Sequence, residues 1–418
     1  MSKWKIYTPD GVQDILFDEC YLKRSLEQKL RMLFRSYGYN ELETPTIEFY
    51  DVFSCDEGAM PQENMFKFFD QQGRILVLRP DITVPVARIT ATKCRDTAFP
   101  LRFSYIGNVF RYNDFGGGKQ NEFTQAGIEV LGVSTPESDA EVISVAINAL
   151  KASGLESFQV DIGQVEFFKG LMEETGLSDE DTAKVCMLID RKDYVGLEEF
   201  LKRCDIREDL KKCIFDLPGF FGSADVIDRV QALNLNSRSR DALENIRQVL
   251  KILEDYGLGQ YVSVDLGMLR GLNYDTGILF RGFTYGVGFP ILTGGRYDRL
   301  VGEFGKDCPA TGFSLGVNLI MMALQRQKTA LEKPETDSII CYSDKGRKTA
   351  FELCDELRRQ GLVVELDIAN SSPEAARSYA ASKNIGGVIS IVDAETVEIH
   401  YVQSGEVAKV QISELLKR

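Results

Sequence analysis

Histidine is almost absent from this chain of 418 residues, which contains a single one, His400, near the C-terminal end. A histidine base or a Ser-His-Asp triad in the main body of the protein is therefore nearly excluded. His400 itself lies in the strand-like run ETVEIHYV, where a surface residue is the expected interpretation. We expect no chemistry centred on this side chain.

Paired cysteines and long apolar runs are also missing. The nine cysteines are scattered, no C-x-x-C pair occurs, and their number is odd, which predicts reduced structural thiols and no metal site. No apolar run approaches a membrane span, and the N-terminal residues lack the apolar stretch and cleavage site of a secretory signal. We therefore expect a cytoplasmic protein with no membrane partner and no cofactor.

Positive charge is in short supply. Lys and Arg number 49 against 63 Asp and Glu, so the formal net charge is -14. A chain whose main task is to grip a polyanion is disfavoured by this balance, although a local basic patch remains open. Nucleic acid is therefore not an expected partner.

Two strands joined by a polar, glycine-rich loop are predicted for residues 102–132. Period-two alternation places Gln125, Gly127 and Glu129 on one face of the second strand, so two polar side chains flank a residue without one. A sheet can leave room for a small polar ligand in this way. A solvated strand face is the alternative, and spacing alone leaves both open.

Three stretches of this chain resemble motifs of one enzyme family. The pair FR and NEFTQAGIEVLG, at residues 110–111 and 121–132, is similar to motif 2 of class II aminoacyl-tRNA synthetases, in the form found in histidyl-tRNA synthetases. LRGLNYDTGILF and TGGRYD, at 269–280 and 293–298, resemble the two histidine signatures of that family. The resemblance implies an α+β fold whose core is an antiparallel sheet of the class II synthetase type.

The order of segments predicts the domain organisation. Residues 1–325 are expected to form the synthetase-like core, interrupted by a helical insertion at about 165–256 where charged amphipathic segments dominate. The segment YNELETPTIEFYDVF resembles motif 1, which implies a dimer interface around Pro45. A strand that leaves its sheet at the proline is the alternative.

A polar stretch at 326–336 is expected to be a linker. Beyond it, residues 337–418 alternate strand and helix, which predicts a parallel sheet covered by helices. This part looks like the α/β anticodon-binding domain of histidyl-tRNA synthetases. No basic stripe is visible in it, so the resemblance does not by itself imply RNA binding.

The motifs have lost the residues that a synthetase uses on ATP. Motif 2 of the family reads F-R-x-E-R-P-Q-x-G-R-x-R-Q-F-x-Q, and here Asn113, Asp114 and Asn121 replace its glutamate and two of its arginines. Motif 3 carries Asn318 and Leu319 at the glutamate and arginine positions. Amino-acid activation needs fixed cations around the polyphosphate, so these changes indicate that the chain does not activate an amino acid.

A further departure favours a paralogous family. Where synthetases read R-P-E-G-T, residues 79–83 read RPDIT, a version associated with regulatory subunits of ATP phosphoribosyltransferase, which controls the first step of histidine biosynthesis. The resemblance implies a non-catalytic subunit that binds the catalytic subunit, as a homodimer within a larger hetero-oligomer, and mediates feedback by histidine. An active histidyl-tRNA synthetase is the alternative, and a third is a paralogue that modifies another protein or RNA; both would need ATP.

The same resemblance assigns a histidine pocket. Asp81 and Thr83 would hold the α-amino group, Gln125 and Glu129 would contact the amine or the imidazole, and Arg270 would face the carboxylate. Arg111 and Arg296 are retained cations. Tyr274 and Tyr297 would supply ring edges and hydroxyls. The family's R-G-L-D-Y-Y appears here with Asn273 and Asp275 as departures; Asp275 could accept an imidazole N–H, or histidine could bind at a subunit interface instead.

Overall fold

The computed structural model describes residues 3–54, 60–112, 120–233, 235–269, 275–329 and 335–415. The chain divides into two compact units, Met1–Ala330 and Leu331–Arg418. The centre of the predicted linker, residues 330–334, lies outside the described residues. Among the residues that the structure describes, no helix has the length and apolar character needed to cross a membrane.

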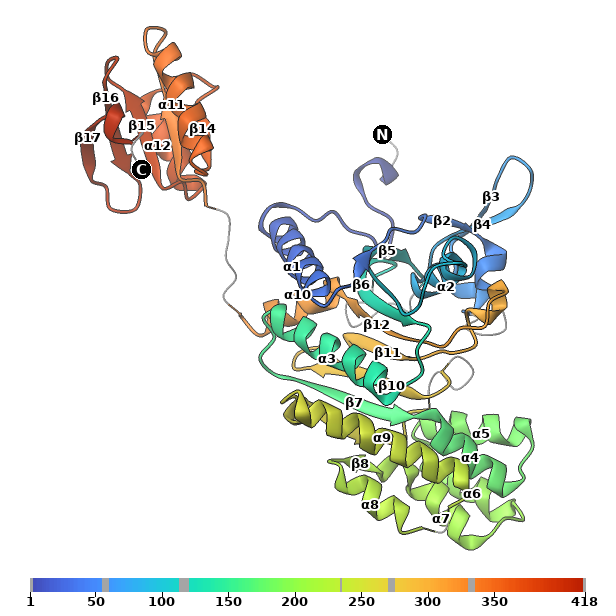
Figure 1. Ribbon diagram of the computed structural model, residues 1–418. Helices are drawn as coiled ribbons and strands as arrows, with labels where there is room; N and C mark the ends of the chain where they lie inside the picture. Colours follow the sequence, from blue (N-terminus) through green and yellow to red (C-terminus); the bar gives the residue numbers. More distant parts are fainter. Residues whose placement is uncertain are drawn as a thin grey trace. The chain divides into compact units, whose positions relative to one another are not determined.

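A nine-stranded sheet forms the centre of the first unit (Figure 1). All its strand pairs are antiparallel except β1 with β5 and β7 with β9. The predicted antiparallel core of the class II type is therefore confirmed. In spatial order the strands are β1 (Asn40–Glu41), β5 (Leu101–Phe110), β6 (Glu122–Leu131), β12 (Ala310–Gly316), β11 (Leu292–Arg296), β10 (Ile278–Thr284), β7 (Phe158–Gln164), β9 (Val262–Asp265) and β8 (Phe221–Gly222).

Three helices pack on one face of this sheet: α1 (Phe17–Ser36), α3 (Pro136–Ala152) and α10 (Val317–Arg326). Leu26, Leu30 and Phe34 are buried at a four-residue spacing, so α1 has one apolar face turned toward the core. The N-terminus of α3 is fixed by a capping box in which the Thr135 hydroxyl accepts from the backbone N–H of Ser138.

The opposite face of the sheet carries helix α2 (Thr83–Thr92) and a small antiparallel sheet. The small sheet has the order β2 (Ile47–Phe49), β4 (Ile75–Leu78) and β3 (Lys67–Phe69). Val77 of β4 and Ile82 before α2 join Leu131 of β6 and Tyr297 in one buried apolar cluster. This cluster holds α2 against the sheet and so positions the residues at its N-terminus.

The chain changes sheets at Pro45, between β1 in the large sheet and β2 in the small one. The buried Arg79 stabilises this crossing, because its guanidinium donates to the backbone oxygen and the hydroxyl of Thr44 and to the backbone oxygen of Asn108. The predicted interruption of the strand at Pro45 is therefore present. Arg79 acts here as a structural residue that ties three segments together.

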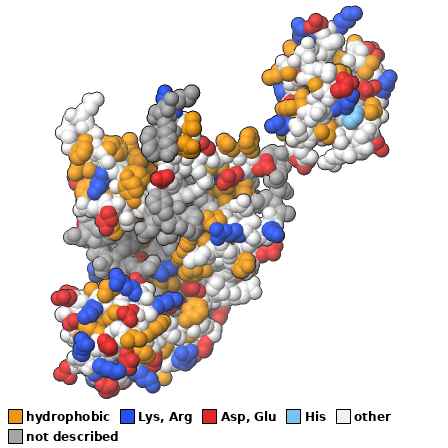
Figure 2. Space-filling view, turned by 180° about the vertical axis from the view of Figure 1, so that it is seen from behind, with side chains coloured by type: hydrophobic (Ala, Val, Ile, Leu, Met, Phe, Trp, Pro, Cys, Tyr) orange, Lys and Arg blue, Asp and Glu red, His pale blue; other side chains and the backbone are white. Residues whose placement is uncertain are grey.

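Six helices lie between β7 and β9: α4 (Val165–Thr175), α5 (Asp179–Asp190), α6 (Tyr194–Arg203), α7 (Glu208–Asp216), α8 (Asp225–Gln231) and α9 (Ser237–Asp255). Figure 1 shows them gathered below β7, with α9 running along the edge of the core. Acidic and basic side chains are intermixed over this region (Figure 2). Ion pairs such as Arg238 with Glu166 cross between its helices.

The second unit contains a five-stranded sheet in the order β14 (Val364–Leu366), β13 (Ser338–Cys341), β15 (Gly387–Ile391), β16 (Thr396–Tyr401) and β17 (Val407–Gln411). The first three strands are parallel, as predicted, and two antiparallel strands extend the sheet. Helices α11 (Arg347–Arg359) and α12 (Pro373–Ser382) pack on it, and α13 (Ile412–Leu415) follows β17. His400 lies on β16, in the predicted strand.

Candidate functional site

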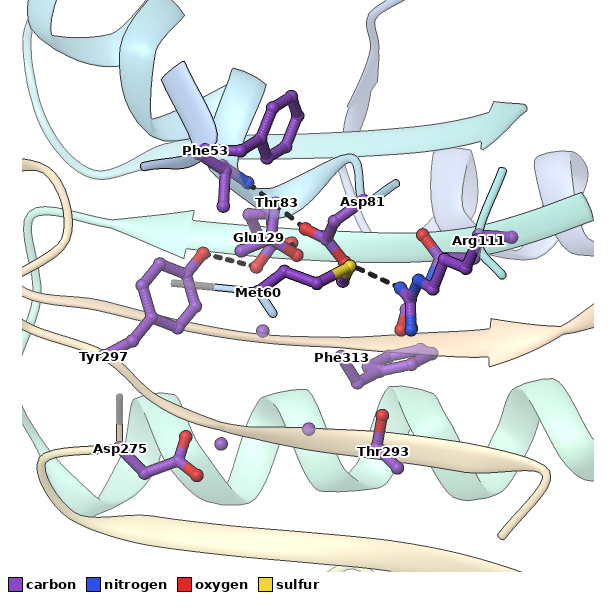
Figure 3. A pocket seen from close by; sticks show the side chains of 16 residues that line it. Phe53, Met60, Asp81, Thr83, Arg111, Glu129, Asp275, Thr293, Tyr297 and Phe313 are labelled. Atoms are coloured by element: carbon purple, nitrogen blue, oxygen red, sulfur yellow. Dashed lines mark hydrogen bonds and ion pairs between the residues drawn. The ribbon is translucent and has the colours of Figure 1, made fainter. Parts of the chain in front are cut away.

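A cavity of about 280 Å³ opens on the α2 side of the large sheet. Figure 3 shows side chains from α2, β6, β11 and the preceding loops converging on it. Six of the residues predicted to bind histidine are described and line this cavity: Asp81, Thr83, Arg111, Gln125, Glu129 and Tyr297. The hydroxyls of Thr83 and Tyr297 also donate to Glu129. The lining residues are Phe53, Met60, Asp81, Thr83, Val84, Arg111, Gln125, Glu129, Asp275, Thr293, Gly294, Gly295, Tyr297, Gly312, Phe313 and Ser314.

Two predicted residues, Arg270 and Tyr274, lie outside the described residues, as do Asn113, Asp114 and Asn273. Their predicted roles stay predictions.

Glu129 is the most buried acid of the cavity, with 1% of its surface exposed. Its carboxyl group accepts hydrogen bonds from the hydroxyls of Thr83 (2.8 Å), Tyr105 (3.1 Å) and Tyr297. Burial raises the pKa of Glu129 to about 8, while the three hydroxyl donors act in the opposite direction. The group therefore takes or releases a proton close to neutral pH, so a cationic ligand would favour its charged form.

Gln125 lies two positions before Gly127 on β6 and is 5% exposed. Its cross-strand partners are Gly107 on β5 and Gly316 on β12, so neither neighbour covers its side chain. The amide oxygen Oε1 is buried and has no hydrogen-bond partner within the described part of the chain. A buried acceptor of this kind is costly when unpaired, so the position calls for a donor supplied by a ligand.

The predicted face of β6 is buried, and the alternative of a solvated strand face is wrong. The space above Gly127, however, is not used by the cavity. A Cβ atom there would lie 2.6 Å from the hydroxyl oxygen of Tyr105, its cross-strand partner on β5. Gly127 therefore makes room for Tyr105 to reach Glu129. Tyr105 was not predicted to belong to the site, although a tyrosine opposite a glycine in a hairpin indicates a side chain that can cross over the glycine.

Two other glycines, Gly295 on β11 and Gly312 on β12, leave room for two acidic side chains of the cavity. They are directly opposite each other in the ladder, so their missing side chains would project from the same face. A Cβ atom at Gly312 would overlap Oε2 of Glu129, and one at Gly295 would lie 2.8 Å from Oδ1 of Asp275. Any larger residue at either position would push into the floor of the cavity.

Asp81, Thr83 and Arg111 form one wall of the cavity. The Asp81 carboxylate accepts a long hydrogen bond from the backbone N–H of Val84 (3.3 Å) and pairs with the Arg111 guanidinium (3.3 Å). Asp81 therefore supports the start of α2 and also faces the cavity. Arg111 additionally donates to the backbone oxygen of Pro80 and stacks over the ring of Phe123.

Arg296 does not belong to the cavity, so its interpretation as a cation available to hold a ligand carboxylate is wrong. Because side chains alternate along β11, Arg296 points to the face opposite that of Gly295. There its guanidinium binds Asp139 (2.8 Å) and Ser138 (2.8 Å) at the N-terminus of α3, and Asp298 (3.0 Å). Its charge is thus used to hold helix and sheet together.

A second cavity, of about 390 Å³, shares Arg111, Gln125, Thr293 and Ser314 with the first. Its other walls are mostly apolar, and among the described residues that line it Arg111 is the one cation. Leu319 lies in this lining, and Asn318 accepts from the backbone N–H of Thr124 (2.9 Å) and donates to Gln120 (2.8 Å). The described walls therefore offer little to a polyphosphate.

Asn121, at the position of a motif 2 arginine, points away from this cavity and fastens the N-terminal segment. Its side-chain amide donates to the backbone oxygen of Asp10 (3.1 Å), and its backbone N–H donates to that of Gly11 (2.7 Å). Gly11 has a positive φ of 76°, and a Cβ atom there would lie 2.6 Å from the Asn121 side chain. The two residues therefore form a close-fitting anchor.

The site is equipped for binding. Its polar groups are carboxyls, hydroxyls, amides and one guanidinium, suited to a small ligand with cationic N–H groups and an anionic group. Within the described ranges, no three His, Cys, Asp or Glu side chains are grouped so as to hold a metal ion.

Comparisons with known proteins point to one group. The family model for histidyl-tRNA synthetase matches residues 11–320. The chain is 64% identical over 417 residues to the ATP phosphoribosyltransferase regulatory subunit of Acetivibrio thermocellus, with 100% of each chain covered. It is 57% identical over 416 residues to the protein of the same name from Ruminiclostridium cellulolyticum, covering 100% of this chain and 99% of that one.

Solved structures give the same picture of the fold. A crystal structure from Bacillus halodurans, described as an ATP phosphoribosyltransferase regulatory subunit/histidyl-tRNA synthetase, superposes with a TM-score of 0.84 at 32% identity, covering 93% of this chain and 98% of that one. The histidyl-tRNA synthetase of Nostoc sp. PCC 7120 also gives 0.84, at 23% identity and with 100% of both chains covered. The second likeness bears on the fold alone.

Proposed function

The chain belongs to the histidyl-tRNA synthetase family and, within it, to the ATP phosphoribosyltransferase regulatory subunits, and from that premise we propose that it controls a separate catalytic subunit by binding histidine. In this role it binds an amino acid without activating it. A place in histidine biosynthesis accounts for the expected cytoplasmic location.

One observation carries the proposal: the two adjoining cavities are lined by very different side chains. The first cavity has a complete set of buried polar groups around Glu129 and Gln125. The second has apolar walls, with Leu319 and Asn318 where a synthetase of this family carries arginine and glutamate. A protein that kept the amino-acid half of the site and lost the phosphate half fits a sensor better than a catalyst.

Each charged group of histidine has a proposed partner at the first cavity. The α-ammonium group would lie near Asp81 and Thr83, within reach of the unpartnered oxygen of Gln125. The ring would lie toward Glu129 and Tyr297. Arg270 is the proposed partner of the carboxylate. Pairing of each buried charge is what desolvation demands, so the affinity should depend strongly on these side chains.

We also propose a homodimer formed through the small sheet. Ile47 and Phe49 of β2 are 49% and 43% exposed, and their cross-strand partners on β4 are Leu78 and Leu76. An apolar sheet face of this kind is costly in water and is typical of an interface. The catalytic subunit would bind a different surface of this dimer to give the larger hetero-oligomer.

The experiment is a reconstitution of ATP phosphoribosyltransferase activity from the purified catalytic subunit and this chain. We expect activity to need this chain and to fall when histidine is added. A Glu129→Gln variant should still support activity but should require much more histidine for inhibition. Glu122→Gln is the matched control, because Glu122 lies on the same strand and accepts from Asn108 instead of lining the cavity.

The alternative function, histidyl-tRNA synthesis, is tested with the isolated chain. Histidine-dependent exchange of pyrophosphate into ATP should be absent. Exchange at rates typical of enzymes, on the order of 10 per second, would contradict the non-catalytic role.

A further inference from the structure

Two carboxyl groups face the same small space from neighbouring strands. Glu129 lies over the Cβ position of Gly312, and Asp275 lies over that of Gly295, its direct partner across the β11–β12 ladder. Cβ positions of such partners are about 5 Å apart, so the two carboxyls lie over neighbouring positions of the cavity floor. Figure 3 shows Asp275 on the side of the cavity opposite Asp81 and Arg111, with Tyr297 and Glu129 above it.

The charges of the described cavity do not balance. Asp81 and Arg111 pair with each other, which leaves Glu129 and Asp275 without a paired cation among the described lining residues. Glu129 accepts from three hydroxyls. Within the described ranges, the Asp275 carboxyl has no hydrogen-bond donor. Lys169 donates to the backbone oxygen of Asp275 (3.3 Å) and not to its carboxyl group. Arg281 and Lys169 affect Asp275 only as nearby charges.

Two independent features thus call for a ligand with several N–H donors. One is the pair of carboxyls, and the other is the buried Oε1 atom of Gln125, which has no partner in the described part of the chain and lines the same cavity. An α-ammonium group can satisfy Gln125 and Asp81. The carboxyls of Glu129 and Asp275 then remain for the other end of the ligand.

We propose that Asp275 determines which side chain the pocket accepts: its carboxylate binds one ring N–H of histidine while Glu129 binds the other, so that histidine is held with its ring as the imidazolium cation. This inference rests on the proposed histidine site and adds the protonation state of the ligand and the residue that selects it.

The chemistry of the ring supports this assignment. Neutral imidazole has one N–H donor and one acceptor nitrogen, so it cannot donate to two carboxylates, whereas imidazolium donates from both nitrogens. Burial raises the pKa of Asp275 to about 8, as it does for Glu129, so each acid is poorly ionised until a cation arrives between them. The ring cation stabilises both carboxylates, and they stabilise the ring cation.

Calorimetry on the full chain at about pH 7 tests the proposal, with histidine, its two ring N-methyl isomers and an Asp275→Asn variant. Each methyl isomer lacks one N–H, so each should bind the wild type at least about tenfold more weakly than histidine. Asp275→Asn should weaken histidine binding by a similar factor. In this variant one methyl isomer should bind as well as histidine does, and the other should still bind more weakly. Asp265→Asn, which changes a half-buried aspartate outside the cavity, is the control for removing a charge from this sheet.

Nitrogen NMR of ring-labelled histidine bound to the protein gives a readout that steric effects of a methyl group do not affect. Both ring nitrogens should show the protonated type of shift in the wild-type complex at a pH where free histidine has lost one of these protons, and one should lose it in Asp275→Asn. Equal histidine affinity for wild type and Asp275→Asn, or a neutral ring in the wild-type complex, would overturn the role of Asp275 while leaving the histidine site intact. A wild-type chain that binds no histidine would overturn both.

Discussion

The guanidinium group of Arg296 binds the carboxylate of Asp139, with 2.8 Å between Nη2 and Oδ1, and both side chains are at most 6% exposed. Burial raises the pKa of Asp139, and the Arg296 charge limits that rise. The pair joins β11 to the start of α3, on the face of the sheet opposite the cavity.

Truncation of this arginine should therefore damage stability more than binding. In an Arg296→Ala variant the Asp139 carboxyl stays buried without its partner, which typically costs about 3–5 kcal/mol. Urea denaturation of the first unit should show this loss. Arg203→Ala, which removes an exposed pair with Glu199 on α6 of the same unit, should change the free energy of unfolding by less than about 1 kcal/mol.

The anchor of the N-terminal segment makes a second prediction. A Gly11→Ala variant places a methyl group 2.6 Å from the Asn121 side chain at a positive φ, so the segment should detach. Gly257→Ala is the matched control, because Gly257 has φ 71° but nothing within 4 Å of its Cβ position. Both variants carry backbone strain of about 1 kcal/mol. The free energy of unfolding of Gly11→Ala should fall by more than this amount, because its methyl group also clashes with Asn121. Limited proteolysis should cut Gly11→Ala near its N-terminus and spare Gly257→Ala.

A third prediction concerns pH. The folded-state pKa of Glu129 is about 8, above the ordinary value of 4.5, so the native protein holds a proton that the unfolded chain releases between these values. Stability therefore falls as pH rises through this window, by at most about 1.4 kcal/mol per pH unit for this group. Glu129→Gln, which cannot ionise, should show a flatter decline in free energy of unfolding between about pH 5 and pH 8. Equal slopes would show that Glu129 is ionised in the empty cavity.

The proposed dimer gives a fourth prediction. Phe49→Glu puts a charge on the exposed apolar face of β2, so it should convert the dimer to a monomer in light scattering. Phe69→Glu is a matched control, because Phe69 is 71% exposed on β3 and pairs with Ile75, which places it on the other face of the small sheet. A wild-type monomer at micromolar concentration, or dissociation by both variants alike, would contradict an interface on the Phe49 face.

Much of the fold was predictable from local signals. Period-two alternation predicted β6, and the alternation of strands and helices predicted the parallel part of the sheet in the second unit. These features depend on neighbours in sequence, so the pattern of side chains is enough to find them.

The details of the site were harder to predict because they depend on register between strands. Gly127 leaves space, as expected, but the space goes to Tyr105, a residue on the partner strand. The direction of Arg296 follows from the alternation along β11 only once its neighbour Gly295 is known to face the cavity. The sequence shows which residue types are available, but the register between strands determines which side chains come into contact.

The anchor formed by Asn121 and Gly11 also bears on whether an arginine could be accommodated at position 121. A position that would carry an arginine in a synthetase now holds the first segment of the chain in place through its short amide. An arginine put back at 121 would have to displace that segment before it could reach a phosphate, because the Asn121 side chain already lies in close contact with Gly11. The substitution would therefore detach the N-terminal segment before it could provide a phosphate contact. Such coupling makes an arginine hard to introduce at this position, unless the N-terminal segment is remodelled first.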